Sequence, residues 1–146
     1  MKFLKSLEPL ALLALRLALA LIFVYHGYPK LAHANAQMRE FFVSHGMPGY
    51  FLWVAGVLEC FGALLLFLGI FTRAIGLLLT IEMSVAIWKV HSSNGIMMVR
   101  DYELPLVLAV ASLVLATVGP GPLSVDHLLF GSGGRSSGKR RLAKAG

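Results

Sequence analysis

The sequence predicts an all-α integral membrane protein, a bundle of four transmembrane helices. Hydrophobic residues make up 58% of the 146 residues and charged residues only 14%, whereas a soluble domain carries about 25% charged residues. The mean hydropathy is strongly positive, at +0.77. The apolar residues are gathered in four blocks, at 10–28, 50–68, 74–90 and 104–118. Each block approaches the roughly 17–20 residues that a helix needs to cross the hydrocarbon core, where an unpaired backbone is not tolerated.

The residues between these blocks predict where each helix begins and ends. Pro9 suits the first turn of the first helix. Gly69 suits the end of the second helix and Thr72 the N-cap of the third, which predicts a tight hairpin. Pro105 lies in the first turn of the fourth helix, which Gly-Pro-Gly-Pro at 119–122 ends. We expect one domain at 1–130, with helices at about 9–30, 50–69, 73–91 and 102–119, and a disordered basic cytoplasmic tail at 131–146.

Lysine and arginine in the loops predict the orientation. Four spans place both termini on one side of the membrane, and that side carries eight cations against four on the other. The positive-inside rule therefore places both termini in the cytoplasm of a multi-pass protein. No aromatic residue interleaves the basic residues of the tail, which argues against nucleic acid as a partner.

Three charged residues lie inside the predicted spans: Arg16, Glu59 and Glu82. Glu59 and Glu82 are equally far from the centre of the predicted hairpin, which places both roughly 17 Å from the turn. Arg16 begins closer to the same face, but its long side chain can extend toward their level. An unpaired charge at this depth is costly, so we expect an inward-facing charge cluster in which Glu59 pairs with Arg16 and Glu82 lies beside them.

This predicted cluster has one carboxylate in excess. A proton shared between the carboxylates, Lys89, or a bound cation could balance it. The cluster could also be purely structural and lock the bundle. Gly56 and Gly62 lie on the same helix face as Glu59, which favours close approach of another helix there.

A second polar group gathers at the predicted non-cytoplasmic ends of the helices. Its members are His26, Lys30, Lys89, His91 and Glu103. They form either an interfacial belt of aromatic residues and ion pairs or a candidate outer polar pocket, where a quinone head group accepts hydrogen bonds from His26 or His91. A haem between these two histidines is a weaker alternative. The sequence has no zinc-type spacing and no phosphate-binding loop, so no metal site is expected.

The chain resembles the DoxX family of small four-helix membrane proteins, over roughly Leu15–Leu129. The resemblance rests on "LIFVYHGYPKLA" after Arg16, on "GVLECFGALLLFLGIFTRAIGLLLTIEM", on "HSSNG", and on "YELPLVLA" with "GPGPLSVD". It implies a bacterial cytoplasmic-membrane protein linked to quinone or sulfur redox chemistry. The family pattern carries over onto Arg16, His26, Gly27, Lys30, Glu59, Gly62, Gly69, Thr72, Arg73, His91 and Glu103. Gly62-Ala63 departs from the glycine pair that the family often shows.

Two functions of different classes are therefore expected. The first is a membrane subunit of a redox complex that works with quinone or a sulfur compound, with the lipid bilayer and partner proteins as its contacts. The second is a non-enzymatic scaffold or assembly factor that recruits partner proteins. A homo-oligomer stays open, quinone is the one cofactor suggested, and no catalytic residue is assigned.

Overall fold

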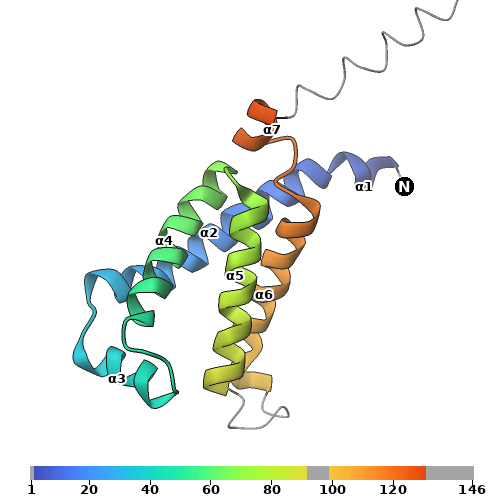
Figure 1. Cartoon of the computed structure of the whole chain (residues 1–146). Helices are drawn as coiled ribbons and strands as arrows, with labels where there is room; N and C mark the ends of the chain where they lie inside the picture. Colours follow the sequence, from blue (N-terminus) through green and yellow to red (C-terminus); the bar gives the residue numbers. More distant parts are fainter. Residues whose placement is uncertain (1, 92–98, 131–146) are drawn as a thin grey trace, which may run out of the picture.

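The computed structural model describes residues 2–91 and 99–130, and every regular element within them is helical. This confirms the predicted all-α fold. Four long segments run along the molecule: α2 (Glu8–Ala32), α4 (Phe51–Leu68), α5 (Thr72–Ala86) with its π-helical continuation η1 (Ile87–His91), and α6 (Val99–Val118) (Figure 1). Three short helices lie between or beyond them: α1 (Lys2–Ser6), α3 (Ala36–Ser44) and α7 (Val125–Phe130).

The outer surface of the long helices is apolar. Large side chains such as Leu21 on α2 and Phe61 on α4 are exposed over 73% and 60% of their surface. Within the described residues α2, α4 and α6 are long and apolar enough to cross a membrane, whereas α5 has 15 residues before it continues into η1. The chain is a multi-pass membrane protein whose exposed helix faces contact lipid.

The long helices pack as two pairs, α2 with α4 and α5 with α6. Glycine permits the close approach in each pair, because a Cβ on Gly27 would lie 2.7 Å from the Cβ of Glu59. In the second pair, a Cβ on Gly76 would lie 2.7 Å from the carbonyl oxygen of Ser112. Contacts between the two pairs are sparser, and α4 and α5 diverge from their shared turn (Figure 1).

The turn between α4 and α5 is held by a partner far along the chain. Gly69 ends α4 in the left-handed conformation, with φ of 70°, as the hairpin prediction required. The prediction that Thr72 caps α5 is wrong: Thr72 is already helical, and the preceding residue makes no side-chain cap. Instead the carboxylate of Asp126, from α7, accepts hydrogen bonds from the backbone N–H groups of Phe71 (2.9 Å) and Thr72 (3.0 Å).

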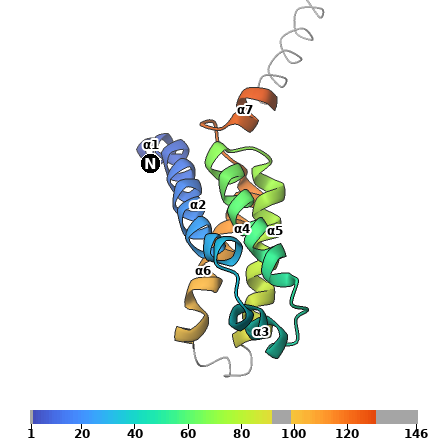
Figure 2. The ribbon, with the colours of Figure 1, turned by 90° about the vertical axis from the view of Figure 1, so that its left-hand side faces the viewer.

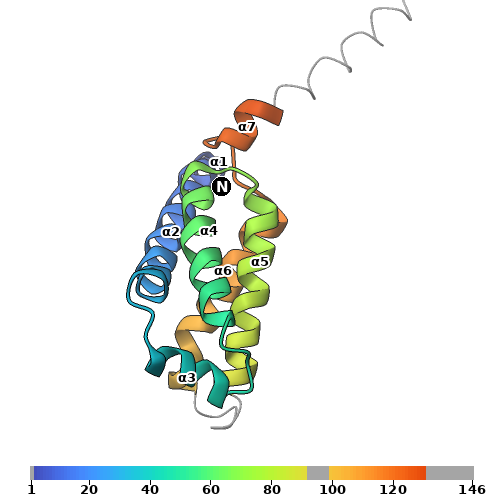
Figure 3. The same ribbon diagram turned by 60° about the vertical axis from the view of Figure 1, so that its left-hand side comes forward.

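The short helix α3 occupies the end of the bundle opposite α7 (Figure 2). Its N-cap is Asn35, whose side chain accepts a hydrogen bond of 2.8 Å from the N–H of Met38. The sequence analysis expected only a connecting loop here. Figure 3 shows α3 beside the ends of α4 and α5, so the loop between the first two spans covers that end of the bundle.

Candidate functional site

A cavity of about 530 Å³ lies between the two helix pairs, at the end of the bundle that α3 covers. Its walls are almost entirely apolar and come from all four long segments and from α3. Of the described residues, four with polar side chains interrupt them: His26 and Lys30 of α2, Glu59 of α4 and Glu82 of α5. Ligand sites for small molecules have this combination of apolar walls and few polar groups, at volumes of roughly 300–1,000 Å³.

Glu59 is paired with Lys30, whose ammonium donates a hydrogen bond to Glu59 Oε2. The prediction that Glu59 pairs with Arg16 is therefore wrong. The reason is the close contact of α2 and α4: a Cβ on Gly56 would lie 3.0 Å from the Cβ of Lys30. Because the two helices approach so closely here, Lys30 extends from the end of α2 into the bundle and lies beside Glu59. Only 3% of the surface of Glu59 is exposed.

Arg16 lies at the opposite end of the bundle and is 2% exposed. Among the described residues its guanidinium donates hydrogen bonds only to backbone carbonyls: to Leu66 (3.1 Å) and Phe67 (3.3 Å) at the end of α4, and to Pro120 (2.9 Å) and Leu123 (2.8 Å) before α7. The last carbonyls of a helix have no partner within the helix and carry partial negative charge. Because these carbonyls accept the hydrogen bonds of Arg16 at its own depth in the bundle, the arginine side chain does not extend to the level of Glu59.

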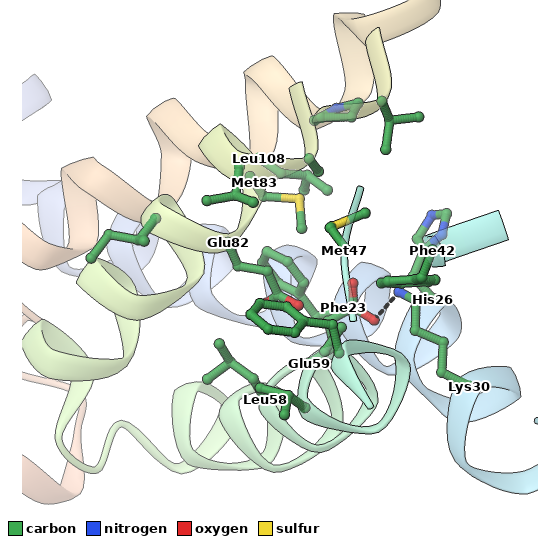
Figure 4. Close-up of a pocket in the computed structure, with 18 of the residues that line it drawn as sticks. Phe23, His26, Lys30, Phe42, Met47, Leu58, Glu59, Glu82, Met83 and Leu108 are labelled. Atoms are coloured by element: carbon green, nitrogen blue, oxygen red, sulfur yellow. Dashed lines mark hydrogen bonds and ion pairs between the residues drawn. The ribbon is translucent and has the colours of Figure 1, made fainter. Parts of the chain in front are cut away.

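Glu82 enters the cavity from α5, on the side opposite Lys30 (Figure 4). Both of its carboxyl oxygens are buried, and neither has a hydrogen-bond partner among the described residues. The charges of Glu59 and Lys30 both act on it. A buried polar group without a partner calls for an explanation, and here the unpartnered group faces a cavity of ligand size.

The candidate outer polar pocket of the sequence analysis is divided by the structure. His26 and Lys30 line the cavity, whereas Lys89 and Glu103 do not. The ammonium of Lys89 lies 5.0 Å from the centroid of the Trp88 ring, and Glu103 is exposed. The side chain of His91 lies outside the described residues. The cavity thus combines part of this group with Glu59 and Glu82 of the predicted charge cluster, while Arg16 is separate from both.

The sequence analysis missed the contribution of the α3 region to the cavity, which comes from Phe41 and Phe42 of α3 and from Met47 after it. Met47 is buried, with 9% of its surface exposed. The available signal was Asn35, a favourable N-cap residue, followed within two turns by an adjacent pair of phenylalanines. A short helix that begins at such a cap can turn aromatic side chains toward the bundle, and here both phenylalanines line the cavity at the end that α3 covers.

The cavity reaches the lipid-facing surface between α4 and α5. Val54 and Ile81, one from each helix, both line it and are exposed over 51% and 52% of their surface. A ligand dissolved in the bilayer can therefore enter sideways without crossing water. Within the described ranges, no group of three or more His, Cys, Asp or Glu side chains could hold a metal ion. The arrangement suits an uncharged, largely apolar ligand with a small polar head.

Comparison with known proteins finds a matching protein family and several relatives. The family model described as DoxX matches residues 11–92. "Putative oxidoreductase CatD" of Bacillus subtilis (strain 168) is 31% identical, over 86% of this chain and 91% of that protein. "Inner membrane protein YphA" of Escherichia coli (strain K12) is 32% identical, over 82% and 91%. "Inner membrane protein YqjF" of the same organism is 28% identical, over 86% and 96%. No solved structure matches the chain significantly.

Proposed function

Because the chain belongs to the DoxX family, we propose that it is a subunit of a redox complex in the bacterial inner membrane and that its cavity binds a membrane quinone. Two of the relatives are named as inner membrane proteins, and one carries the name "Putative oxidoreductase CatD". These names support the location and the reaction class of the proposal. The observation that carries it is the cavity itself, which is open toward lipid and has its few polar groups inside.

The residues of the cavity fit a quinone by their chemistry. A quinone has a flat apolar ring, two carbonyl oxygens and an isoprenoid tail. Phe23, Phe42 and Met83 line the cavity and suit the ring. Lys30 and His26 are hydrogen-bond donors for a carbonyl oxygen. The exposed apolar residues between α4 and α5 leave a path for the tail into the bilayer.

The proposal includes an orientation. With both termini in the cytoplasm, α3 and the cavity lie toward the non-cytoplasmic face of the membrane. A partner protein or reductant that delivers electrons to a quinone in this cavity then approaches from that face.

The proposal is tested by binding and by purification. The protein is purified from its native membrane, its bound quinone and partner proteins are identified, and decylubiquinone binding is measured in detergent. Ala86 lines the cavity, so the larger side chain of Ala86→Phe should obstruct it and weaken binding. Leu64→Phe, on an exposed face of α4 outside the lining, is the matched control. If wild-type protein binds no quinone, the quinone assignment is wrong, and if no redox protein co-purifies, the complex is wrong.

A membrane scaffold is the second candidate function, and one observation favours it. Arg16 and the Lys30–Glu59 pair both join separate helices, as expected if the buried charges only hold the bundle together. A scaffold recruits its partners through its surface. Under both proposals Ala86→Phe leaves the recovery of partner proteins unchanged. Only under the redox proposal does it also lower quinone reduction by the recovered complex.

A further inference from the structure

We propose that Glu82 is the ligand-contact residue of the cavity, held as a neutral carboxylic acid that donates its proton in a hydrogen bond to a carbonyl oxygen of an uncharged, lipid-soluble ligand. The inference rests on the proposed function and names the chemistry by which the site recognises its ligand. It goes beyond a quinone-sized cavity by assigning one hydrogen bond to one side chain.

The position of Glu82 supports a direct contact with the ligand. Its two oxygens are buried and unpartnered within the described part of the chain, and its side chain lines the cavity. In Figure 4 the carboxyl group extends from α5 toward the side from which Lys30 and Glu59 approach. A native structure satisfies nearly all of its buried polar groups. A cavity of about 530 Å³ supplies the room for a ligand atom to be the missing partner.

The charges around Glu82 support its neutral, protonated form. Among the described residues, the charged groups that act on it are Glu59 and Lys30, and these two form an ion pair with each other. Arg16 is held by carbonyls at the other end of the bundle. An ionised Glu82 would therefore leave a net negative charge facing an apolar cavity inside the membrane. A protonated Glu82 leaves the cavity neutral and has one O–H to donate.

The remaining donors decide between two kinds of ligand. A lipophilic amine could balance an ionised Glu82, but it offers no acceptor to Lys30, whose ammonium has three donors and gives one of them to Glu59. A carbonyl oxygen can accept hydrogen bonds from both Lys30 and protonated Glu82. The same polar groups therefore favour a carbonyl compound over a cation.

Two substitutions of Glu82 separate these possibilities. The side chain of Glu82→Gln still donates a hydrogen bond but cannot carry a negative charge, and Glu82→Leu can do neither. Binding of decylubiquinone and of decylamine is measured for both variants and for wild type. The exposed Glu103 is outside the cavity, so Glu103→Gln and Glu103→Leu are the matched controls.

We expect Glu82→Gln to bind decylubiquinone within about threefold of wild type, and Glu82→Leu to bind about tenfold more weakly, the loss typical of one hydrogen bond. If Glu82→Leu binds as well as wild type, or if Glu82→Gln is as weak as Glu82→Leu, the inference is wrong while quinone binding stands. If wild type binds only decylamine, and both variants lose it, Glu82 is an ionised cation site. Wild type that binds neither probe overturns the inference and the quinone assignment together.

Thermal unfolding of the ligand-free variants gives a second readout. Glu82 has no hydrogen-bond partner to lose within the part of the chain that the structure describes, so Glu82→Leu should unfold at the wild-type temperature or above it. A clear drop in the midpoint would mean that Glu82 is ionised and stabilised by the charges around it, and the neutral-acid assignment would fail.

Discussion

Replacing Arg16 by methionine should destabilise the bundle more than any other single charge removal. Methionine retains much of the length of the side chain but no donor. It removes the guanidinium that four backbone carbonyls now share; of these, the Leu66 carbonyl still accepts a hydrogen bond from the N–H of Gly69. Each buried acceptor left unpaired costs roughly 1–3 kcal/mol. Part of this cost is recovered where the segment before α7 can move toward water, so we expect a total loss of about 3–5 kcal/mol, the range seen when a buried charged contact is broken.

The donor geometry of Arg16 predicts an intermediate result for lysine. A guanidinium has a fixed fork of five N–H donors, whereas an ammonium is compact and has three. Arg16→Lys can reach the end of α4 or the segment before α7, but not all four carbonyls at once. We expect it to lose about half as much stability as Arg16→Met. The measurement is unfolding in mixed detergent micelles, followed by circular dichroism.

The control is Arg100→Met, because Arg100 lies on the exposed surface at the start of α6. Its substitution should stay within about 0.5 kcal/mol of wild type. Equal unfolding curves for the Arg16 and Arg100 variants would refute the assignment of Arg16 as the link between α4 and the segment before α7. Combining Arg16→Met with Glu59→Gln gives a further check, since residues without shared partners should show additive losses.

Three other outcomes are expected. Lys30→Met and Glu59→Gln should each lower the free energy of unfolding by a few kcal/mol, because either single change leaves a buried charged partner unpaired. The double variant should lose clearly less than the sum of the two single losses, and additive losses would contradict the ion pair. Gly27→Leu should separate α2 from α4, since even a Cβ there would meet Glu59 at 2.7 Å, and should lower the midpoint by several degrees in thermal scans, with Leu17→Ile on the exposed face of α2 as an unaffected control. A periplasmic reporter should be silent when fused after residue 146 and active when inserted near residue 37, and the reverse pattern would overturn the predicted orientation.

The fold class could be predicted because the membrane leaves few choices. Blocks of apolar residues must become helices, and glycine and proline between them mark the turns. The same reasoning accounts for Gly69, whose left-handed conformation the structure shows. It did not reveal α3, because a helix of nine residues with mixed polarity has a weak pattern beside four hydrophobic blocks.

The partner of Arg16 could not be predicted from side chains alone. The sequence analysis searched for a carboxylate, since a buried cation is usually paired with one. The structure uses carbonyl oxygens at the end of α4 and before α7 instead. Every residue has a carbonyl, so no sequence pattern distinguishes those that are free to accept. The position of Asp126, which holds the turn before α5, was missed for a related reason: it depends on how the segment after α6 folds back.

The pairing of Lys30 depended on a helix crossing that hydropathy does not reveal. Depth along each helix places Glu59 and Glu82 at a similar level, and both line one cavity in the structure. The depth of a residue along its helix does not show which helices are in contact. The contact of α2 with α4 at Gly27 and Gly56 brings Lys30 inward, although its position near the end of a span suggested a place at the interface.

The distribution of buried charge indicates where function can be separated from stability. Arg16 and the Lys30–Glu59 pair each join helices, so their substitution destabilises the bundle, and a loss of activity in such variants does not separate function from stability. Glu82 contributes no hydrogen bond within the described chain, and burying it without one is unfavourable to folding. A residue that lowers stability and lines a ligand-sized cavity is best explained by what it does for the ligand. Substitutions at Glu82 therefore test function in a bundle that remains folded.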